Sequence, residues 1–219
     1  MAIPLAALPA QAAPDGSNVV INEVYVHGGS KAGIYRDYVE LYNPTDAPID
    51  LNGMSLQYFS EKGTGGNGTT ALTGTIAPSG YYLVYGDDTD NDADATDLIV
   101  DATGKMQMSG SKGSVVLFNV PDRQTISNPV DTTTLDTVVD AFGWGSAGIK
   151  ETASFGTSTA AGESYQRAVE GVDTDDNSVD FTKAAPTPMY SGGSALEEST
   201  DPGEDPTTPP AGEITPIAD

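Results

Sequence analysis

Short apolar runs alternate with turn-forming residues along the middle of the chain. The runs are rich in Val, Ile, Leu and Tyr, and clusters of Gly, Pro, Asn and Asp separate them. This pattern is typical of β-strands joined by turns, and no segment keeps the 3.6-residue period of a long helix. We therefore expect an all-β protein whose antiparallel strands form a sandwich or barrel. The expected strands are Val19–His27, Asp37–Tyr42, Met54–Tyr58, Tyr81–Tyr85, Ser114–Asn119, Thr137–Phe142 and Ser164–Val169.

The glycine-rich stretch Gly63–Gly68 (GTGGNG) is predicted to be a flexible hairpin loop. A phosphate-binding loop of this composition would be followed by a helix, whose N-terminal amides face the phosphate. Here the following residues, Thr69–Gly74, read as a strand.

The two ends of the chain differ in composition from the middle. Residues 1–17 contain the apolar stretch Ala2–Ala13, in which Ala10-Gln11-Ala12 fits the pattern before a signal-peptidase cut. They are either the end of a secretion signal or a disordered leader. Residues 191–219 are rich in Pro and acidic residues and lack aromatic residues, which is typical of a spacer. We expect one folded domain over residues 18–190, and then a linker toward a downstream domain outside this chain.

Acidic residues outnumber basic ones by 32 to 9, and the formal net charge is -23. Phosphate groups would be repelled, and the basic residues are scattered singly, so no direct nucleic-acid binding is expected. The same charge disfavours an anionic membrane surface, and no membrane association is expected. The absence of Cys excludes disulfides, thiolate catalysis and Cys-based zinc sites. A protein or a glycan is the expected class of partner, and the chain is expected to be a monomer.

The most concentrated acidic segment runs from Asp87 to Asp97. Carboxylates at its alternate positions can converge on one hard cation when the loop curls, and Ca²⁺ takes about six to eight oxygen ligands. The EF-hand template is broken, because its sixth position is Ala93 and its twelfth is Ile99. The segment is therefore either a calcium loop or a solvated acidic loop. The candidate metal ligands are Asp88, Asp90, Asp92 and Asp94.

A second acidic cluster lies close to the end of the expected domain. Asp173, Asp175 and Asn177 reproduce the D-x-D-x-N opening of calcium loops, and Asp180 can add a fourth oxygen. The twelfth position is Ala184, so this segment also departs from the EF-hand. Asx-turns are the competing explanation for the same residues. Calcium is the one candidate cofactor of the chain.

Two carboxylates fall inside expected strands. Strand alternation places Glu23 on the same face as Ile21 and Tyr25. It places Glu40 on the same face as Tyr38 and Tyr42. A buried carboxylate needs a partner, and the planar guanidinium of Arg167 suits one. We expect Arg167 to pair with Glu23 or Glu40; a catalytic carboxylate pair is the alternative, for which the sequence indicates no cleft. The expected structural polar network comprises Glu23, Glu40, Arg167 and Asn43, which caps a turn.

No catalytic constellation is recognisable, and the chain is not expected to be an enzyme. His27 is the only histidine, and there is no G-x-S-x-G nucleophile motif. A His-based catalytic zinc site normally uses more than one His. Trp144, between Gly143 and Gly145, either packs in the core or contacts a ligand by stacking on a sugar or gripping a peptide.

Several spaced motifs carry a family resemblance. They are VINEV at Val20–Val24, YVELYNP at Tyr38–Pro44, IDLNGMSL at Ile49–Leu56, GYYLV at Gly80–Val84, SVVL at Ser114–Leu117, DTVVDAFG at Asp136–Gly143 and ESYQR at Glu163–Arg167. In this order the motifs resemble the lamin tail domain of bacterial type, over about Asn18–Ser191. Met54 stands where that family usually has Trp. The resemblance implies an immunoglobulin-like antiparallel β-sandwich.

The resemblance also implies a function. In nuclear lamins this module is an interaction platform, and in bacteria it is a non-catalytic module on secreted proteins. Val172–Phe181 and Ala185–Pro188 look like the end of the N-terminal lamin tail module of secreted endonuclease/exonuclease/phosphatase-family nucleases, and Ile214–Asp219 resembles the lead-in to their next domain.

We therefore expect an accessory or binding module of a secreted or cell-surface bacterial protein. The expected parent protein is an extracellular nuclease or phosphoesterase. The alternatives are a stand-alone adhesion or protein-interaction module with structural calcium, and a chain that is itself a hydrolase.

Overall fold

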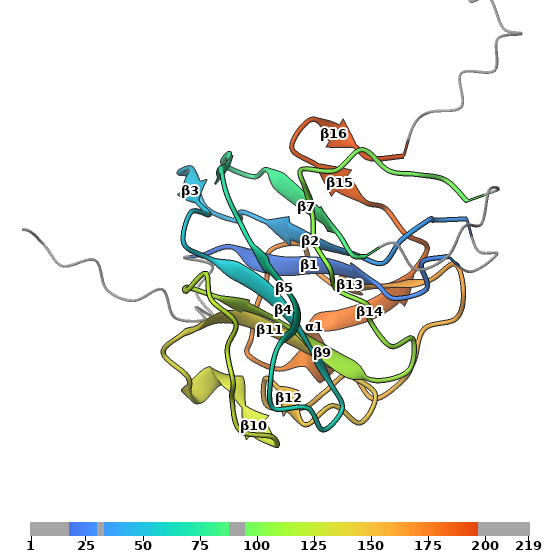
Figure 1. Cartoon of the computed structure of the whole chain (residues 1–219). Coiled ribbons are helices and arrows are strands. Elements are labelled where there is room, and N and C mark those ends of the chain that lie inside the picture. Colours follow the sequence, from blue (N-terminus) through green and yellow to red (C-terminus); the bar gives the residue numbers. More distant parts are fainter. Residues whose placement is uncertain (1–17, 30–32, 88–94, 197–219) are drawn as a thin grey trace, which may run out of the picture.

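The computed structural model describes residues 18–29, 33–87 and 95–196. Two sheets stack face to face in it and form an immunoglobulin-like sandwich (Figure 1). In spatial order, the larger sheet contains β14 (Phe181–Ala184), β13 (Ser164–Arg167), β1 (Val20–Tyr25), β2 (Tyr38–Tyr42), β7 (Tyr81–Tyr85) and β8 (Ala102–Thr103). The smaller contains β11 (Val138–Trp144), β9 (Gly113–Phe118), β4 (Ser55–Ser60) and β5 (Asn67–Ala71).

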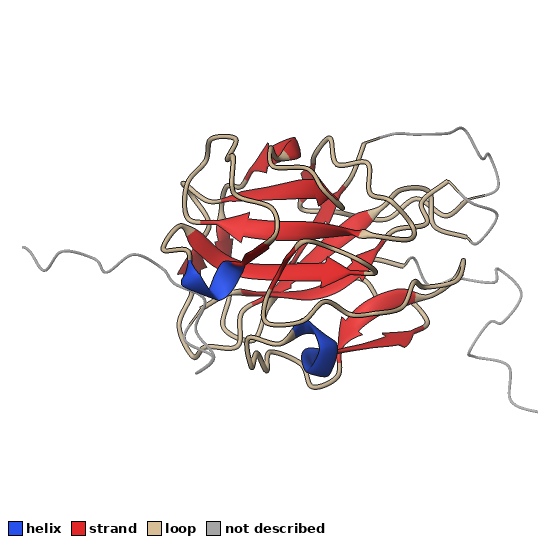
Figure 2. Ribbon diagram, turned by 90° about the horizontal axis from the view of Figure 1, so that it is seen from below, coloured by secondary structure: helices blue, strands red, loops and turns tan. Residues whose placement is uncertain are grey.

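Short elements surround the two sheets. The two-stranded pairs are β3 (Ile49–Asp50) with β6 (Thr75–Ile76), β10 (Val130–Asp131) with β12 (Ile149–Lys150), and β15 (Met189–Tyr190) with β16 (Gly193–Ser194). The helical pieces are η1 (Thr132–Thr134) and α1 (Asn177–Asp180), which Figure 2 shows beside the strands. Among the described residues, no helix has the length and apolar character needed to cross a membrane.

The predicted all-β fold class is confirmed. Each of the seven expected runs overlaps a strand, and β5 begins at Asn67, two residues before the strand expected after the GTGGNG loop. The pattern did not predict β14 or the two-residue strands. Such short strands bury too few side chains to leave a periodic signal.

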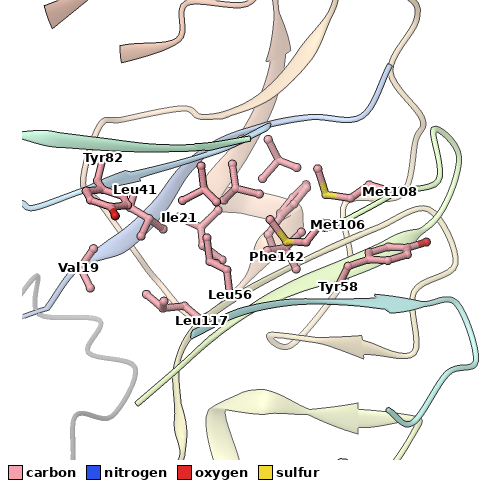
Figure 3. Packing of buried hydrophobic residues seen from close by; sticks show 14 of the residues in the cluster. Val19, Ile21, Leu41, Leu56, Tyr58, Tyr82, Met106, Met108, Leu117 and Phe142 are labelled. Atoms are coloured by element: carbon pink, nitrogen blue, oxygen red, sulfur yellow. The ribbon is translucent and has the colours of Figure 1, made fainter. Parts of the chain in front are cut away.

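The main core lies between the two sheets. Ile21 and Leu41 from the larger sheet meet Leu56, Leu117 and Phe142 from the smaller one (Figure 3). Five aromatic side chains also pack at this interface, in tilted and stacked pairs: Tyr58, Phe142, Trp144, Tyr165 and Phe181.

Both sheets are covered on their outer faces as well. Tyr25, Tyr38 and Leu83 pack outside the larger sheet against Leu98 and Ala195. Outside the smaller sheet, Phe59, Val116, Phe118, Val138 and Ala141 pack against Ile149. Every residue of β9 and β11 is therefore buried, which explains why these strands read as continuous apolar runs rather than alternating ones.

Two β-bulges determine which side chains face the core. The register of β1 against β2 shifts between Ile21 and Glu23, and that of β11 against β9 shifts between Val138 and Asp140. A bulge reverses the facing of every later residue in its strand. Glu23 therefore shares the outer face with Tyr25, as expected, but Ile21 faces the inner core, which corrects the sequence-based assignment.

Candidate functional site

Arg167, the last residue of β13, ties the two sheets together. Its Nη2 lies 2.8 Å from Oδ2 of Asp140, on β11 of the opposite sheet. Its Nη1 lies 3.4 Å from Asp173 Oδ1 and 3.6 Å from Asp180 Oδ2, and its Nε donates to the Ile21 carbonyl at 2.8 Å. The side chains of Arg167 and Asp140 are fully buried. A single buried cation thus pairs with a carboxylate of the smaller sheet and with two on the connection between β13 and β14 of the larger sheet.

The expected pairing of Arg167 with Glu23 or Glu40 is wrong. The register of β1 with β13 sets Gln166 opposite Glu23 on the outer face. Arg167, one residue further along, points to the inner side, since strand side chains alternate. Asp140 is its partner instead, and Asp140 Oδ2 also accepts the Ile21 amide at 2.6 Å, beside the bulge of β1.

Asn177 joins this cluster to Glu151, which follows β12. Its Nδ2 donates to Glu151 Oε2 at 2.9 Å and to the Ala141 carbonyl at 2.8 Å. Its Oδ1 accepts from the amides of Gly143 at 2.9 Å and Glu151 at 3.3 Å. Glu151 Oε1 accepts from the Ala141 amide at 3.0 Å. One fully buried side chain therefore holds α1, β11 and the segment after β12 in place.

The carboxylates of this cluster converge. One oxygen from each of Asp140, Glu151 and Asp173 lies within 4.8 Å of the other two. Burial, reinforced by the charge of Asp140, raises the pKa of Glu151 well above its usual range and that of Asp173 to about 7, while Arg167 opposes both shifts. The raised pKa values express the cost of ionising these buried carboxylates together beside a single guanidinium.

The four ligands predicted in the second acidic cluster do not converge on one point. Asp173 belongs to the converging carboxylates, and Asp175 is not part of that group. Asp180 accepts from the Thr174 amide at 2.9 Å and from its hydroxyl at 2.6 Å, and Asn177 is occupied by the contacts above. An Asx-turn is present too, because the Asp175 amide donates to Asp173 Oδ1 at 3.1 Å. The other predicted ligands, Asp88, Asp90, Asp92 and Asp94, lie outside the described residues.

Sequence reasoning did not identify Asp140 or Glu151. Asp140 lies within the apolar run VVDAFG, and a lone carboxylate in a fully buried strand is the signal that could have been used. Glu151 follows a two-residue strand and stands next to Lys150 in the sequence, so no local pattern distinguishes it from a surface residue.

A second pair of buried carboxylates lies on the outer face of the larger sheet. Glu23 and Glu40 are cross-strand neighbours in β1 and β2. Glu23 accepts from the Tyr38 hydroxyl and from the amide and hydroxyl of Thr187, and both latter distances are 3.1 Å. Glu40 accepts from the Met189 amide at 2.7 Å and is 1% exposed. The two carboxylates thereby fasten the C-terminal segment onto the sheet.

Burial raises the pKa of Glu40 to about 8 from its ordinary 4.5, and the facing Glu23 adds to the increase while a hydrogen bond from Asn22 opposes it. Between these two pH values the unfolded chain loses the proton and the folded chain keeps it. Stability is therefore expected to fall as pH rises from 4.5 to about 8, by up to about 1.4 kcal/mol per pH unit.

Urea unfolding from pH 4.5 to 8.5 checks this expectation in wild type and Glu40→Gln. The variant should become more stable relative to wild type as pH rises, and Asp46→Asn, which alters an exposed carboxylate, should not. A difference between Glu40→Gln and wild type that does not change with pH would contradict it.

Two other expected site residues, Asn43 and Trp144, have structural roles, and so does His27. Asn43 caps a turn, as its Oδ1 accepts from the Thr45 amide at 2.9 Å. Trp144 is fully buried and donates from Nε1 to the Ser109 carbonyl at 3.0 Å, so it is not available to contact a ligand, which corrects that candidate role. His27 contacts the carbonyl and hydroxyl of Thr159 through Nε2 at 3.1 and 3.0 Å.

Among solved structures, the chain is similar to a DUF4876 family protein from Bacteroides thetaiotaomicron. The TM-score is 0.54 at 14% sequence identity, and the match covers 84% of this chain and 75% of that chain. At this identity the likeness shows the fold alone. No curated protein matches the chain.

A family model provides the closer assignment. The model of the lamin tail domain matches residues 12–146, which is more than half of the chain and includes β1 through β11. Strands β13 and β14 follow the matched residues but extend the same larger sheet. By this match, the chain belongs to the lamin tail domain family.

Proposed function

We propose that the chain is a non-catalytic accessory module of a secreted bacterial protein whose nuclease or phosphoesterase activity lies in another domain. The observation that carries the proposal is the burial of the carboxylates with the most altered acidity. Glu40, Glu151 and Asp173 are at most 2% exposed, and each is engaged by scaffold hydrogen bonds. A general acid or base must reach a proton of its substrate, and these groups are placed to hold the sandwich together instead.

Two surface hollows of the described residues support the same conclusion. One of about 400 Å³ is lined by Gly66, Asn67, Gly68, Thr69, Lys105 and Arg123, without a carboxylate or histidine. The other, of about 150 Å³, is lined by apolar residues and by Thr174 and Asp180. Asp180 accepts from the Thr174 hydroxyl at 2.6 Å and lies 3.6 Å from the Arg167 guanidinium. An ionised carboxylate paired in this way is a poor general base.

An assay of the purified chain tests the proposal. We expect no turnover of double- or single-stranded DNA or of a chromogenic phosphodiester with CaCl2, MgCl2 or MnCl2, and no shift of DNA in a gel. A known phosphodiesterase serves as the positive control. Hydrolysis that follows the chain through two chromatographic steps and is reduced in Asp173→Asn would contradict a non-catalytic role.

Exposed valines favour a second candidate, a stand-alone cell-surface module that binds another protein. Val169, Val172 and Val179 are 62%, 45% and 65% exposed and border the smaller hollow. A glycan partner has less support, since the single Trp is buried. The intact mass of the natural protein, recovered from culture medium or from the cell surface, discriminates the two. A polypeptide that continues past Asp219 into a phosphodiesterase domain supports the accessory role.

A further inference from the structure

We propose that Asp140, Glu151 and Asp173 form a binding site for one Ca²⁺ ion that cross-links the two sheets of the sandwich. One carboxylate oxygen from each of these residues lies within 4.8 Å of the other two. Opposite ligands of a Ca²⁺ ion are separated by up to about 5 Å, since each Ca–O distance is about 2.3–2.6 Å. The oxygens therefore stand at a separation that one ion can bridge.

Two of these carboxylates carry an unpartnered buried oxygen. Asp140 Oδ2 is occupied by Arg167 and by the Ile21 amide, while its Oδ1 is buried and accepts no hydrogen bond. Asp173 repeats this arrangement, with Oδ1 engaged and Oδ2 buried and unpartnered. Buried polar atoms are almost always satisfied in native proteins, and a cation bound between these residues would satisfy both.

The charge balance supports a cation of high charge. When ionised, Asp140, Glu151 and Asp173 act on one cation, Arg167, and Asp180 adds a fourth carboxylate 3.6 Å from that guanidinium. Buried carboxylates are costly unless they are paired or coordinate a metal. A divalent ion would offset two of the charges that Arg167 leaves uncompensated.

The donor set selects a hard cation. All three side chains offer oxygen, and neither His nor Cys is among them, which disfavours zinc and other softer metals. Mg²⁺ demands shorter bonds and usually keeps several waters, whereas Ca²⁺ accepts cages made of carboxylates. We therefore assign the site to Ca²⁺.

The site would connect segments that lie far apart in the sequence. Asp140 belongs to β11 of the smaller sheet, and Asp173 precedes α1 on the connection between β13 and β14 of the larger sheet. Glu151 follows β12. Bound calcium should therefore raise the unfolding temperature of the whole sandwich rather than order one loop.

Calorimetric and thermal titration of the full chain with CaCl2 tests the site. Asp88, Asp90, Asp92 and Asp94 are first replaced by Asn, so that this acidic segment cannot contribute. We expect one Ca²⁺ per chain, a Kd below about 1 mM, a rise in Tm that EDTA reverses, and a weaker effect of MgCl2. The site is independent of the proposed function, because neither readout involves activity or cellular location.

Asp173→Asn is the central variant in that background. It keeps Oδ1 as an acceptor and replaces only the unpartnered oxygen by an amide nitrogen, which cannot bind the ion. We expect affinity for Ca²⁺ to fall at least about tenfold, and the calcium-induced rise in Tm to disappear.

Asp176→Asn is the matched control. It removes the same charge from the adjacent residue, whose Oδ1 accepts the Ser178 amide at 3.0 Å as the N-cap of α1, and Asn is an equally good cap. We expect its affinity to stay within about twofold of the background protein. Absence of calcium binding, or binding that Asp173→Asn leaves unchanged, would overturn the assignment.

Discussion

Replacing Arg167 by Leu is expected to lower the free energy of unfolding by about 3–5 kcal/mol. The substitution removes the one guanidinium that faces Asp140, Asp173 and Asp180, all of which are buried. Breaking a buried ion pair leaves an uncompensated charge, and here it leaves several. For a domain of this size the loss corresponds to roughly 6–20 °C in Tm, which urea and thermal unfolding can both measure.

Two variants make this result specific. Arg167→Lys keeps the charge but not the planar fork, so it should lose less stability than Arg167→Leu. Arg123→Leu is the same change at an exposed residue, and it should cost less than about 1 kcal/mol. A melting temperature of Arg167→Leu close to that of wild type would contradict the structural role of the cluster.

Trp144→Ala is also expected to lower the free energy of unfolding by about 3–5 kcal/mol. The indole is fully buried, and its ring centroid lies 5.7 Å from that of Phe142, 5.9 Å from that of Tyr165 and 6.1 Å from that of Tyr58. The variant leaves a cavity among these rings and an unpaired carbonyl at Ser109. Urea unfolding measures the loss.

Trp144→Phe provides the comparison, because it keeps most of the ring volume and should cost clearly less than Trp144→Ala. Trp144 is the only Trp of the chain, so its fluorescence reports directly on its surroundings. We expect emission typical of a buried indole and weak quenching by acrylamide. Strong quenching in the folded protein would show that the side chain is accessible and that its assignment to the core is wrong.

The strands could be predicted from sequence because their signal is local. Runs such as YVELY and SVVLF are rich in residues that favour β-strands, and turn-forming residues bound them. Composition and flanking residues therefore both indicate a strand. The GTGGNG loop was predicted in the same way, from the strand that follows it. The sandwich then follows from several short strands that must bury their apolar faces against each other.

The facing of the side chains could not be predicted, because it depends on two bulges. No residue type marks the register shift in β1, yet the shift puts Ile21 in the inner core and Glu23 outside. The partner of Arg167 depends in turn on this facing. Asp140 is 27 residues away in the chain, and only the packing of the two sheets brings them within 2.8 Å.

Only part of the buried acidic cluster could be predicted, because the rest of it also depends on how the two sheets pack. Asp173 and Asp175 belong to one short motif, which the sequence displays. Asp140 and Glu151 approach that motif through tertiary packing alone. The motif also misled, since Asn177 and Asp180, which it offered as ligands, are used to hold β11 and a turn in place.

A double-mutant cycle between Arg167 and Asp140 tests most directly whether this ion pair ties the two sheets together. The single variants Arg167→Leu and Asp140→Leu and the double variant are unfolded in urea, with EDTA present throughout. We predict a coupling energy of about 1–3 kcal/mol, with the double variant more stable than the sum of the single losses implies. Losses that add to within about 0.5 kcal/mol would contradict the account.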